Sequence, residues 1–331
     1  MLNVFILGED GAVRFDGEPK SLSAAMRNQK ATFWVDMDQP TEEEYALLDE
    51  VFGFHPLAIE DTIQYQQRPK IESYNHVGDA CDTGYFYMVI HGPDLRTFRE
   101  NVRTKELDIF VSERYLITIH DEPMSSIEQV MTRVRGDPRR VLEHGIDVLL
   151  HSILDRLVDH YQPILEHLQE SIEKLEEDAL NNPSVTLLSE LSRERRELLH
   201  LRRVIGPQRD VIAQLSRGEV PFIREATRVY FRDVQDHLNR AVEMIELYRE
   251  LIASARDLYL SATNNNLNRI MKTLTIVTVV TAVLNVMTGF FGMNFDYIPG
   301  LHSMGAFWSI VGVMLVMVTV SIGFFRRMRW L

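Results

Sequence analysis

Two long uncharged runs near the C-terminal end constrain the fold more than any other feature of the sequence. The first covers residues 273–293 and the second covers residues 303–325. Each is about 20 residues long, the length that an α-helix needs to cross the hydrocarbon core of a bilayer. The stretch 291–295, with the sequence FGMNF, stands between them. It is therefore predicted to lie in a tight turn on the face of the membrane away from the rest of the protein.

The charges that flank the two runs predict the orientation. Basic residues precede the first run and follow the second, whereas the connecting loop carries only Asp296 and His302: the basic residues are Arg269, Lys272, Arg326, Arg327 and Arg329. Because cytoplasmic flanks are enriched in Lys and Arg, both termini of this multi-pass protein are predicted to be cytoplasmic. Trp330 fits an anchor at the membrane interface.

The overall charge and the cysteine content exclude some classes of protein. The formal net charge of -13 argues against nucleic acid binding and suits a protein that handles cations. The single cysteine, Cys81, rules out an intramolecular disulfide. The first ten residues have no basic region and do not resemble a signal peptide, so the bulk of the chain is expected in the cytoplasm.

Residues 1–125 are predicted to form an α+β cytoplasmic domain. Short β-branched and aromatic runs predict strands at 4–7, 32–35, 85–90, 107–111 and 115–119. Thr41 and Glu44 form a capping box for a helix that ends near Gly53. His55-Pro56 begins a second short helix, which carries Glu60 and Asp61.

The rest of the chain is predicted to be helical. Apolar residues recur every three or four positions through residues 140–180, and Asn181-Asn182-Pro183-Ser184 separates that pattern from a helix over 184–216. No Pro or Gly occurs from 222 to 288, so one helix of about 100 Å is expected to enter the membrane. The predicted divisions are a cytoplasmic helical hairpin (126–220), the cytoplasmic part of a long pore helix (221–272), transmembrane helix 1 (273–293), an extracytoplasmic loop (294–303), transmembrane helix 2 (304–325) and a basic cytoplasmic tail (326–331).

A seam of small and polar residues follows one side of the first span. Its members alternate at intervals of four and three: Asn264, Asn268, Met271, Thr275, Thr278, Ala282, Asn285 and Gly289. Asn and Thr side chains are expensive in lipid, so the seam is expected to face protein or water. It either packs against other helices or lines a pore, and a pore requires an oligomer because two helices cannot enclose one.

These features resemble the CorA family of magnesium and cobalt channels. The resemblance rests on two C-terminal spans with Gly292-Met293-Asn294 between them and on the basic tail that ends Arg329-Trp330-Leu331. It also rests on three upstream motifs: His55-Pro56-Leu57 with Glu60-Asp61, Arg68-Pro69-Lys70, and Tyr230-Phe231-Arg232-Asp233-Val234. Together these motifs extend over essentially the whole chain.

The resemblance implies a homopentamer whose first span lines the pore, while the cytoplasmic domains form a funnel around the long helices. It implies transport of Mg²⁺ across the plasma (inner) membrane, with Co²⁺ as a possible second substrate, and an outer selectivity site at Gly292, Met293 and Asn294. Uptake is the expected direction because an inside-negative potential drives a divalent cation into the cell. It also implies pore constrictions among the polar and hydrophobic residues Asn264, Asn268, Met271, Leu274 and Thr275. Regulatory Mg²⁺ is expected between subunits at Asp61 and Asp233, with Glu60 beside the first. The chain departs from the common family pattern at Ala282-Val283 and at Asn285, where a wider or more polar pore is expected.

Two other functions remain open from the sequence. The first is a zinc transporter of a related branch, coupled to protons, although the histidine pairs 144/151 and 160/167 lack the close spacing of metal ligands. The second is a membrane scaffold or metal sensor that does not transport ions. An enzyme is not expected, because the sequence has no phosphate loop, Gly-x-Ser-x-Gly or His-Glu-x-x-His motif.

Overall fold

The computed structural model describes residues 1–8, 13–16, 19–28, 30–64, 67–74, 84–137, 144–293 and 304–330. The chain divides into two compact units. Unit 1 contains Met1–Glu177 and Val185–Ala255, and unit 2 contains Asp178–Ser184 and Arg256–Leu331. Each unit is described below by itself.

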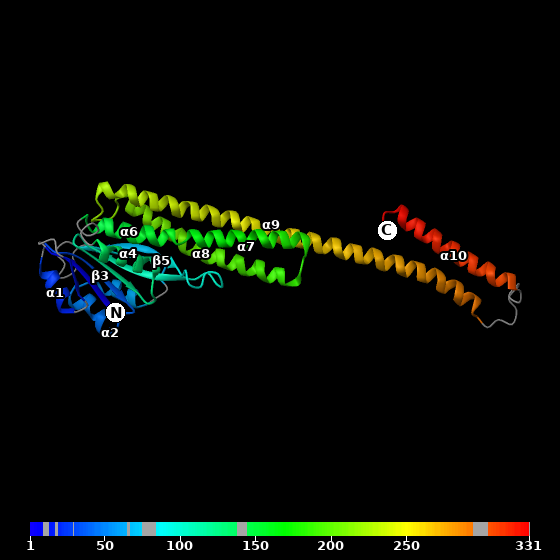
Figure 1. The fold of residues 1–331 in the computed structure, drawn as a ribbon, viewed down its shortest axis with the longest axis horizontal. Helices are drawn as coiled ribbons and strands as arrows, with labels where there is room; N and C mark the ends of the chain where they lie inside the picture. Colours follow the sequence, from blue (N-terminus) through cyan, green and yellow to red (C-terminus); the bar gives the residue numbers. More distant parts are fainter. Residues whose placement is uncertain are drawn as a thin grey trace. The chain divides into compact units, whose positions relative to one another are not determined.

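A seven-stranded mixed sheet forms the centre of the N-terminal part of unit 1 (Figure 1). Its strands are β1 (Leu2–Leu7), β2 (Val13–Asp16), β3 (Thr32–Asp38), β4 (Lys70–Tyr74), β5 (Tyr85–Pro93), β6 (Thr104–Val111) and β7 (Tyr115–His120). They lie in the order β2-β1-β3-β7-β6-β5-β4. The β3–β7 pair is parallel, and the other described pairs are antiparallel. Strands β3, β5, β6 and β7 are buried along nearly their whole length, and hence on both faces, which explains their continuous apolar runs.

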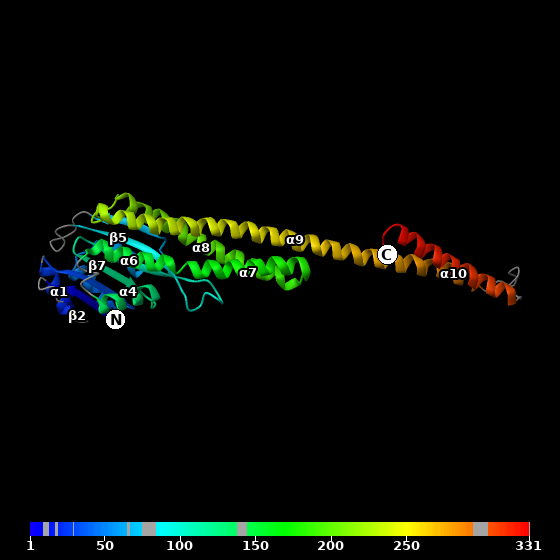
Figure 2. The ribbon, with the colours of Figure 1, turned by 45° about the horizontal axis from the view of Figure 1, so that its top comes forward.

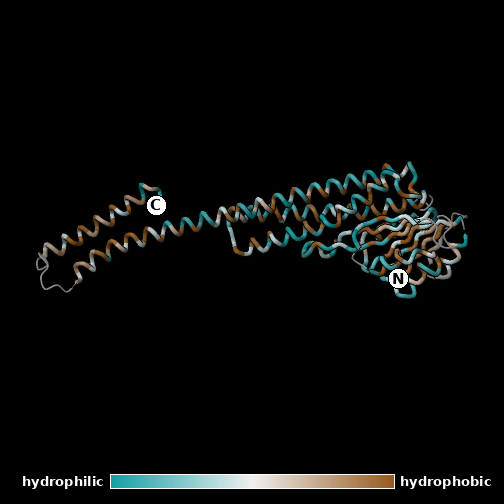
Figure 3. The backbone as a smooth tube through the Cα atoms, turned by 180° about the vertical axis from the view of Figure 1, so that it is seen from behind, coloured by the Kyte–Doolittle hydropathy of each residue, from teal (hydrophilic) through white to brown (hydrophobic). Residues whose placement is uncertain are grey.

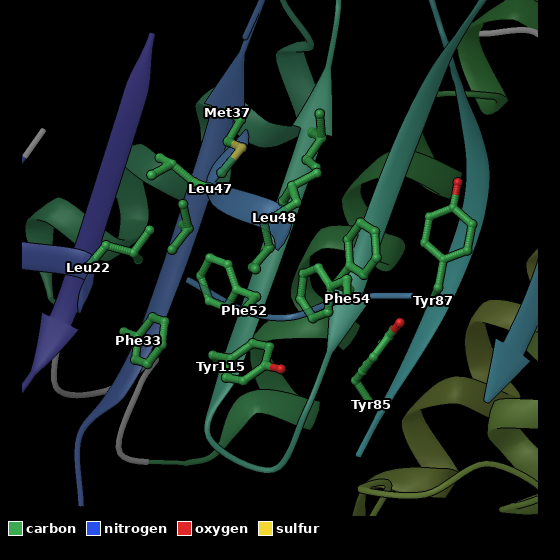
Figure 4. Packing of buried hydrophobic residues seen from close by; sticks show 14 of the residues in the cluster. Leu22, Phe33, Met37, Leu47, Leu48, Phe52, Phe54, Tyr85, Tyr87 and Tyr115 are labelled. Atoms are coloured by element: carbon green, nitrogen blue, oxygen red, sulfur yellow. The ribbon is translucent and has the colours of Figure 1, made fainter. Parts of the chain in front are cut away.

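One face of the sheet is covered by three short helices, α1 (Pro19–Arg27), α2 (Glu42–Glu50) and α3 (Pro56–Ile63). The capping box predicted at Thr41 is present, and His55 caps α3, which has Pro56 in its first turn. Between these helices and the sheet lies an aromatic core (Figure 4). Phe54 stacks on Phe110 with ring centroids 4.2 Å apart, so the connection that leads into α3 is fixed to the middle of the sheet.

The opposite face is covered by α4 (Ser125–Gly136) and α6 (Ile146–Asp159), and α6 contacts both β5 and β7. The hydroxyl of Tyr161, which is buried, donates a hydrogen bond to the carbonyl oxygen of His91 at 2.7 Å. Residues 126–220, predicted as a helical hairpin, contain α4, α6, α7 (Gln162–Asn181) and α8 (Val185–Arg217). The apolar pattern over 140–180 is divided at His160, where α6 ends and α7 follows.

Long helices pack beside one another in unit 1, where α7, α8 and the first part of α9 run side by side (Figures 1 and 2). Polar contacts join them at three levels: Ser171 to Glu194, Gln169 to Tyr248, and Arg202 to Glu246. Helix α9 is continuous from Glu225 to Phe291, which confirms the single long helix expected from the absence of Gly and Pro.

The start of α9 is fixed to the start of α6 by the buried carboxylate of Asp147. It accepts hydrogen bonds from the backbone N–H and side chain of Arg224 and from the Thr227 hydroxyl, the last at 2.6 Å. It thus acts as an acceptor for the N-terminal turn of α9, where helix N–H groups lack partners within the helix. Burial raises the pKa of Asp147, but the bonds from Arg224 and Thr227 outweigh it and hold the pKa below its usual value.

Unit 2 contains the C-terminal part of α9 and helix α10 (Met304–Arg327). Figure 3 shows predominantly hydrophobic colouring along α10 and along the end of α9, in contrast to the mixed colouring of unit 1. Cys81 and the predicted loop 294–303, including Asn294, Asp296 and His302, lie outside the described residues.

Candidate ion pathway and regulatory carboxylates

Within the described part of the chain, two helices, α9 and α10, are long and apolar enough to cross a membrane, as expected from the uncharged runs. Helix α10 ends in Arg326 and Arg327, and the chain then turns back so that Trp330 stacks on Phe325 with ring centroids 5.7 Å apart. The basic cluster and an aromatic side chain thus end the second span together, as is common at a membrane interface.

The seam of the first span lies on the exposed side of its helix. Its members from Asn264 to Gly289, and Leu274 beside them, are exposed, apart from Thr275, which is partly buried. The partly buried residues on the apolar run of α9 include Ile276, Val280, Val283, Leu284 and Met287. At 3.6 residues per turn, this second set is centred on the side of the helix opposite to the seam. The seam is therefore not the side that packs within the chain.

The threonines of this segment satisfy their hydroxyl protons within the helix. Thr273, Thr275, Thr278, Thr281 and Thr288 each donate to the carbonyl oxygen four residues earlier, at 2.6–3.0 Å. Such bonds remove the cost of an unpaired donor in a water-poor environment. They allow hydroxyl groups to lie along a membrane helix without a second helix to receive them.

Helix α9 ends where the FGMN stretch begins. The N–H of Gly292 bonds to the carbonyl oxygen of Thr288 at 2.8 Å, and a Cβ at Gly292 would lie 2.8 Å from that same oxygen. This contact with backbone leaves little room for any residue except glycine. Met293 is exposed, and Asn294 lies outside the described residues.

Asp61 and Glu60 lie at the C-terminal end of α3 and face different partners. The Asp61 carboxylate, about a quarter exposed, accepts a hydrogen bond from the ammonium group of Lys70 on β4. Glu60 is exposed and accepts a hydrogen bond from the side chain of Gln64 at 3.0 Å. The two acids are adjacent in sequence, but only Asp61 already holds a cation.

Lys70 is held by two carboxylates. Its ammonium contacts Asp61 and lies 3.2 Å from Glu72, which accepts a hydrogen bond from Tyr74 at 2.7 Å. Burial lowers the pKa of Lys70, but the hydrogen bonds to Asp61 and Glu72 outweigh it and raise the pKa above its usual value. The ammonium group is thus fully charged at neutral pH.

Asp233 lies on the exposed surface of α9, and its side chain is 68% exposed. Its carboxylate oxygen is 3.9 Å from Nε2 of His237, one turn later, and Nδ1 of His237 is 3.6 Å from Asp159 on α6. Burial, followed by the charge of Asp159, raises the pKa of the neighbouring Asp155. The sequence interpretation missed His237 and Asp159. The spacing of four between Asp233 and His237 was a usable signal, since it places both side chains on one face of a helix.

A single chain does not assemble the predicted metal site. Among the described residues, no group of three or more His, Cys, Asp or Glu side chains lies close enough to hold a metal ion. Asp61 contacts Lys70, whereas Asp233 contacts His237, and no contact between the two acids is present in the described structure. In the single chain each acid therefore lies on its own helix with its own partner.

The comparisons with known proteins agree over most of the chain. The family model described as CorA-like Mg²⁺ transporter protein matches residues 29–327. The YfjQ protein of Bacillus subtilis is 36% identical over 301 residues, which cover 91% of this chain and 90% of that protein. The cobalt/magnesium transport protein CorA of Thermotoga maritima is 30% identical over 285 residues, covering 85% of this chain and 78% of its own length.

A solved structure extends the likeness to the fold. The complete structure of the CorA magnesium transporter from Methanocaldococcus jannaschii superimposes with a TM-score of 0.81 and 25% identity, covering 100% of this chain and 99% of that chain. The α+β domain, the long helices and the two C-terminal spans thus form the CorA fold. This protein belongs to the CorA-like Mg²⁺ transporter family, whose members are membrane-embedded divalent metal ion transporters and not enzymes.

Proposed function

We propose that this protein is a channel for Mg²⁺, with Co²⁺ as a second substrate, that carries ions into the cell down the membrane potential. The observation that carries the proposal is the seam of α9, which is polar, lies in an apolar span and faces away from the side that packs within the chain. Such a seam in lipid would be expensive, so it requires a partner or water. Symmetric copies of α9 with their seams facing one axis meet that requirement.

The choice of a homopentamer and of Mg²⁺ and Co²⁺ rests on the family. Two relatives at 29–30% identity carry the name cobalt/magnesium transport protein, which favours these ions over Zn²⁺ as the substrate here. Mg²⁺ gives up its water shell reluctantly and prefers oxygen ligands. A ring of Asn294 side chains beside Gly292 and Met293 suits that chemistry, because amide oxygens can hold the hydrated ion through its waters.

The driving force needs no nucleotide. An inside-negative potential of 100 mV is worth about 2.3 kcal/mol per unit charge, hence about 4.6 kcal/mol for a divalent ion. The side chains at Met271 and Leu274 are both more than half exposed on the seam side, where a ring of such residues could gate the path by excluding water.

The proposed regulation uses Asp61, Glu60 and Asp233 between neighbouring subunits, with regulatory Mg²⁺ present when its cytoplasmic concentration is high. The donor chemistry fits, because all three offer the hard oxygen atoms that Mg²⁺ prefers, and Asp61 already holds an ammonium ion where a metal cation would bind. His237 lies beside Asp233, and its other ring nitrogen faces Asp159, so His237 is positioned to orient Asp233. Bound ions would screen carboxylates that otherwise repel, which favours the closed assembly.

The experiment that tests the transport proposal measures Mg²⁺ entry into proteoliposomes under an inside-negative potential. Asn294→Ala should abolish entry that is rapid in the wild type. Within α9, Asn268→Leu on the seam should reduce entry strongly, whereas Asn266→Leu, on the other side of the same turn, should leave it close to wild type. Equal effects of Asn268→Leu and Asn266→Leu would contradict a pore along the seam. Entry of Zn²⁺ with a pH gradient, and not of Mg²⁺, would instead favour the zinc branch.

A further inference from the structure

Lys70 stands out because its charge lies directly on a carboxylate that the proposed function gives to a metal ion. Its side chain is 27% exposed, and its ammonium group contacts Asp61, whose side chain is 26% exposed. The same ammonium lies 5.6 Å from the ring centroid of Tyr87, on the neighbouring strand. The ammonium therefore lies between a carboxylate and an aromatic face, at the end of a side chain that strand β4 carries.

The position of the ammonium matters because two cations that share one carboxylate oxygen repel each other at short range. A divalent ion that binds Asp61 must separate that carboxylate from Lys70 or accept a positive charge a few ångströms away. Either course weakens the binding of the ion. The cost depends on no other subunit, because Asp61 and Lys70 belong to the same chain.

We propose that Lys70 is a tethered cation that competes with regulatory Mg²⁺ for Asp61 and so sets the concentration at which the site fills. The proposal rests on the regulatory role of Asp61 stated above. Through this competition the site would stay free of Mg²⁺ at low concentrations. It would bind Mg²⁺ only when the cytoplasmic concentration is high enough to displace the ammonium group. Lys70 is then a residue that sets affinity, while Asp61 is the ligand.

Glu72 gives the displaced ammonium a second partner. It lies 3.2 Å from the Lys70 nitrogen, and its other oxygen is held by the Tyr74 hydroxyl at 2.7 Å. Because these three residues lie on one short strand, the ammonium can shift towards Glu72 without leaving its ion pair. The exchange of Lys70 for a metal ion at Asp61 therefore needs only a side-chain movement.

The test measures the midpoint of thermal unfolding of the full chain in detergent as MgCl₂ is raised at constant ionic strength. An ion that binds only the folded protein raises this midpoint, and the half-saturating concentration reports its affinity. Lys70→Met keeps the length of the side chain and removes its charge. It should lower the half-saturating Mg²⁺ concentration roughly tenfold, since a unit charge a few ångströms from a divalent ion has about that effect even in a water-like dielectric.

Three controls separate competition from other effects. Lys30→Met makes the same change of net charge at an exposed position on another part of unit 1, and should match the wild type. Lys70→Arg keeps the charge and should not lower the half-saturating concentration. Glu72→Gln should raise that concentration when Lys70 is present, and should do so less in the Lys70→Met background.

The outcomes distinguish the two proposals. If Asp61→Asn abolishes the Mg²⁺ response and Lys70→Met matches Lys30→Met, then the regulatory site stands and the competition by Lys70 is refuted. If Asp61→Asn responds to Mg²⁺ as the wild type does, the regulatory role of Asp61 is wrong and the inference about Lys70 is overturned with it. A roughly tenfold decrease in Lys70→Met alone, lost in the double variant with Asp61→Asn, supports both.

Discussion

Replacing Asp147 by Ala should destabilise the protein by about 2–4 kcal/mol, a value that follows from the partners which the carboxylate serves. The Thr227 hydroxyl is buried and would lose its acceptor, at about 1–2 kcal/mol. The N–H of Arg224 at the start of α9 would lose a capping acceptor, at about 1 kcal/mol. The Arg224 side chain is 57% exposed and can return to water, so its ion pair adds at most about 1 kcal/mol.

The measurement is the midpoint of thermal unfolding of the full chain in detergent, where the substitution should cause a decrease of about 5–10 °C. Asp147→Asn keeps the acceptor oxygen for Thr227 and should cost about 1 kcal/mol. Asp210→Ala removes an acid whose ion pair with Arg209 is exposed, and serves as the control with a shift near zero.

The pH dependence gives a second check on Asp147. Its pKa is depressed in the folded state, so its stabilisation is present above the unfolded value of about 3.9 and is lost as the pH falls through the folded pKa. The difference between wild type and Asp147→Ala should therefore shrink at acid pH. A difference that is below 1 °C at neutral pH, or one that does not change with pH, would refute the reasoning.

Three further predictions concern a buried histidine, a buried hydroxyl and the seam. Burial lowers the pKa of His120, but the Asp36 carboxylate, whose Oδ1 lies 3.2 Å from Nε2 of His120, and the nearby acids outweigh it and raise the pKa. Stability from this pair is present below about pH 6.5 and is lost as the pH rises through the folded pKa. The unfolding midpoint should therefore fall across this range in the wild type and less in His120→Gln. Tyr161→Phe leaves the carbonyl of His91 without its donor and should cost about 1–2 kcal/mol in denaturant unfolding, against near zero for the exposed Tyr230→Phe. Thr278→Val removes one hydroxyl from the seam at constant shape and should slow Mg²⁺ entry several-fold while the thermal midpoint changes little; unchanged entry would place Thr278 outside the ion path.

The strands show how far the sequence predicts this fold. The five predicted strands, β1, β3, β5, β6 and β7, are all present, because each carries an apolar run that the inner part of a sheet requires. The two strands that the sequence interpretation missed, β2 and β4, are the two edges of the sheet. Their sequences, VRFD and KIESY, are rich in charge, as edge strands commonly are to avoid pairing with other chains. The charged residues that protect an edge strand from pairing with other chains also remove the apolar pattern by which a strand is recognised in a sequence.

The candidate site also has parts that the sequence predicts and parts that it does not. The long helix, the two spans and the seam follow from periodicity and from missing Gly and Pro, which are local properties of the chain. The neighbours of the regulatory acids do not. Lys70 reaches Asp61 only because β4 pairs with β5 at the edge of the sheet, and Asp159 reaches His237 only because α6 lies against α9. Such contacts depend on tertiary packing that no spacing along the sequence records.

The hydrogen bonds that the threonines of the first span make to their own helix determine which sign of charge their oxygen atoms favour. Each hydroxyl hydrogen is directed at a carbonyl oxygen of its own helix, so the oxygen can offer only lone pairs to anything on the outside. The part of the seam at Thr275 and Thr278 should therefore favour cations over anions without a single ionised group. It also keeps its polarity when the helix turns or slides, since the donor and acceptor move together. Selection of cations over anions can thus arise from the hydrogen bonds between these side chains and the backbone of their helix. It does not depend on acidic residues that a change of pH would neutralise.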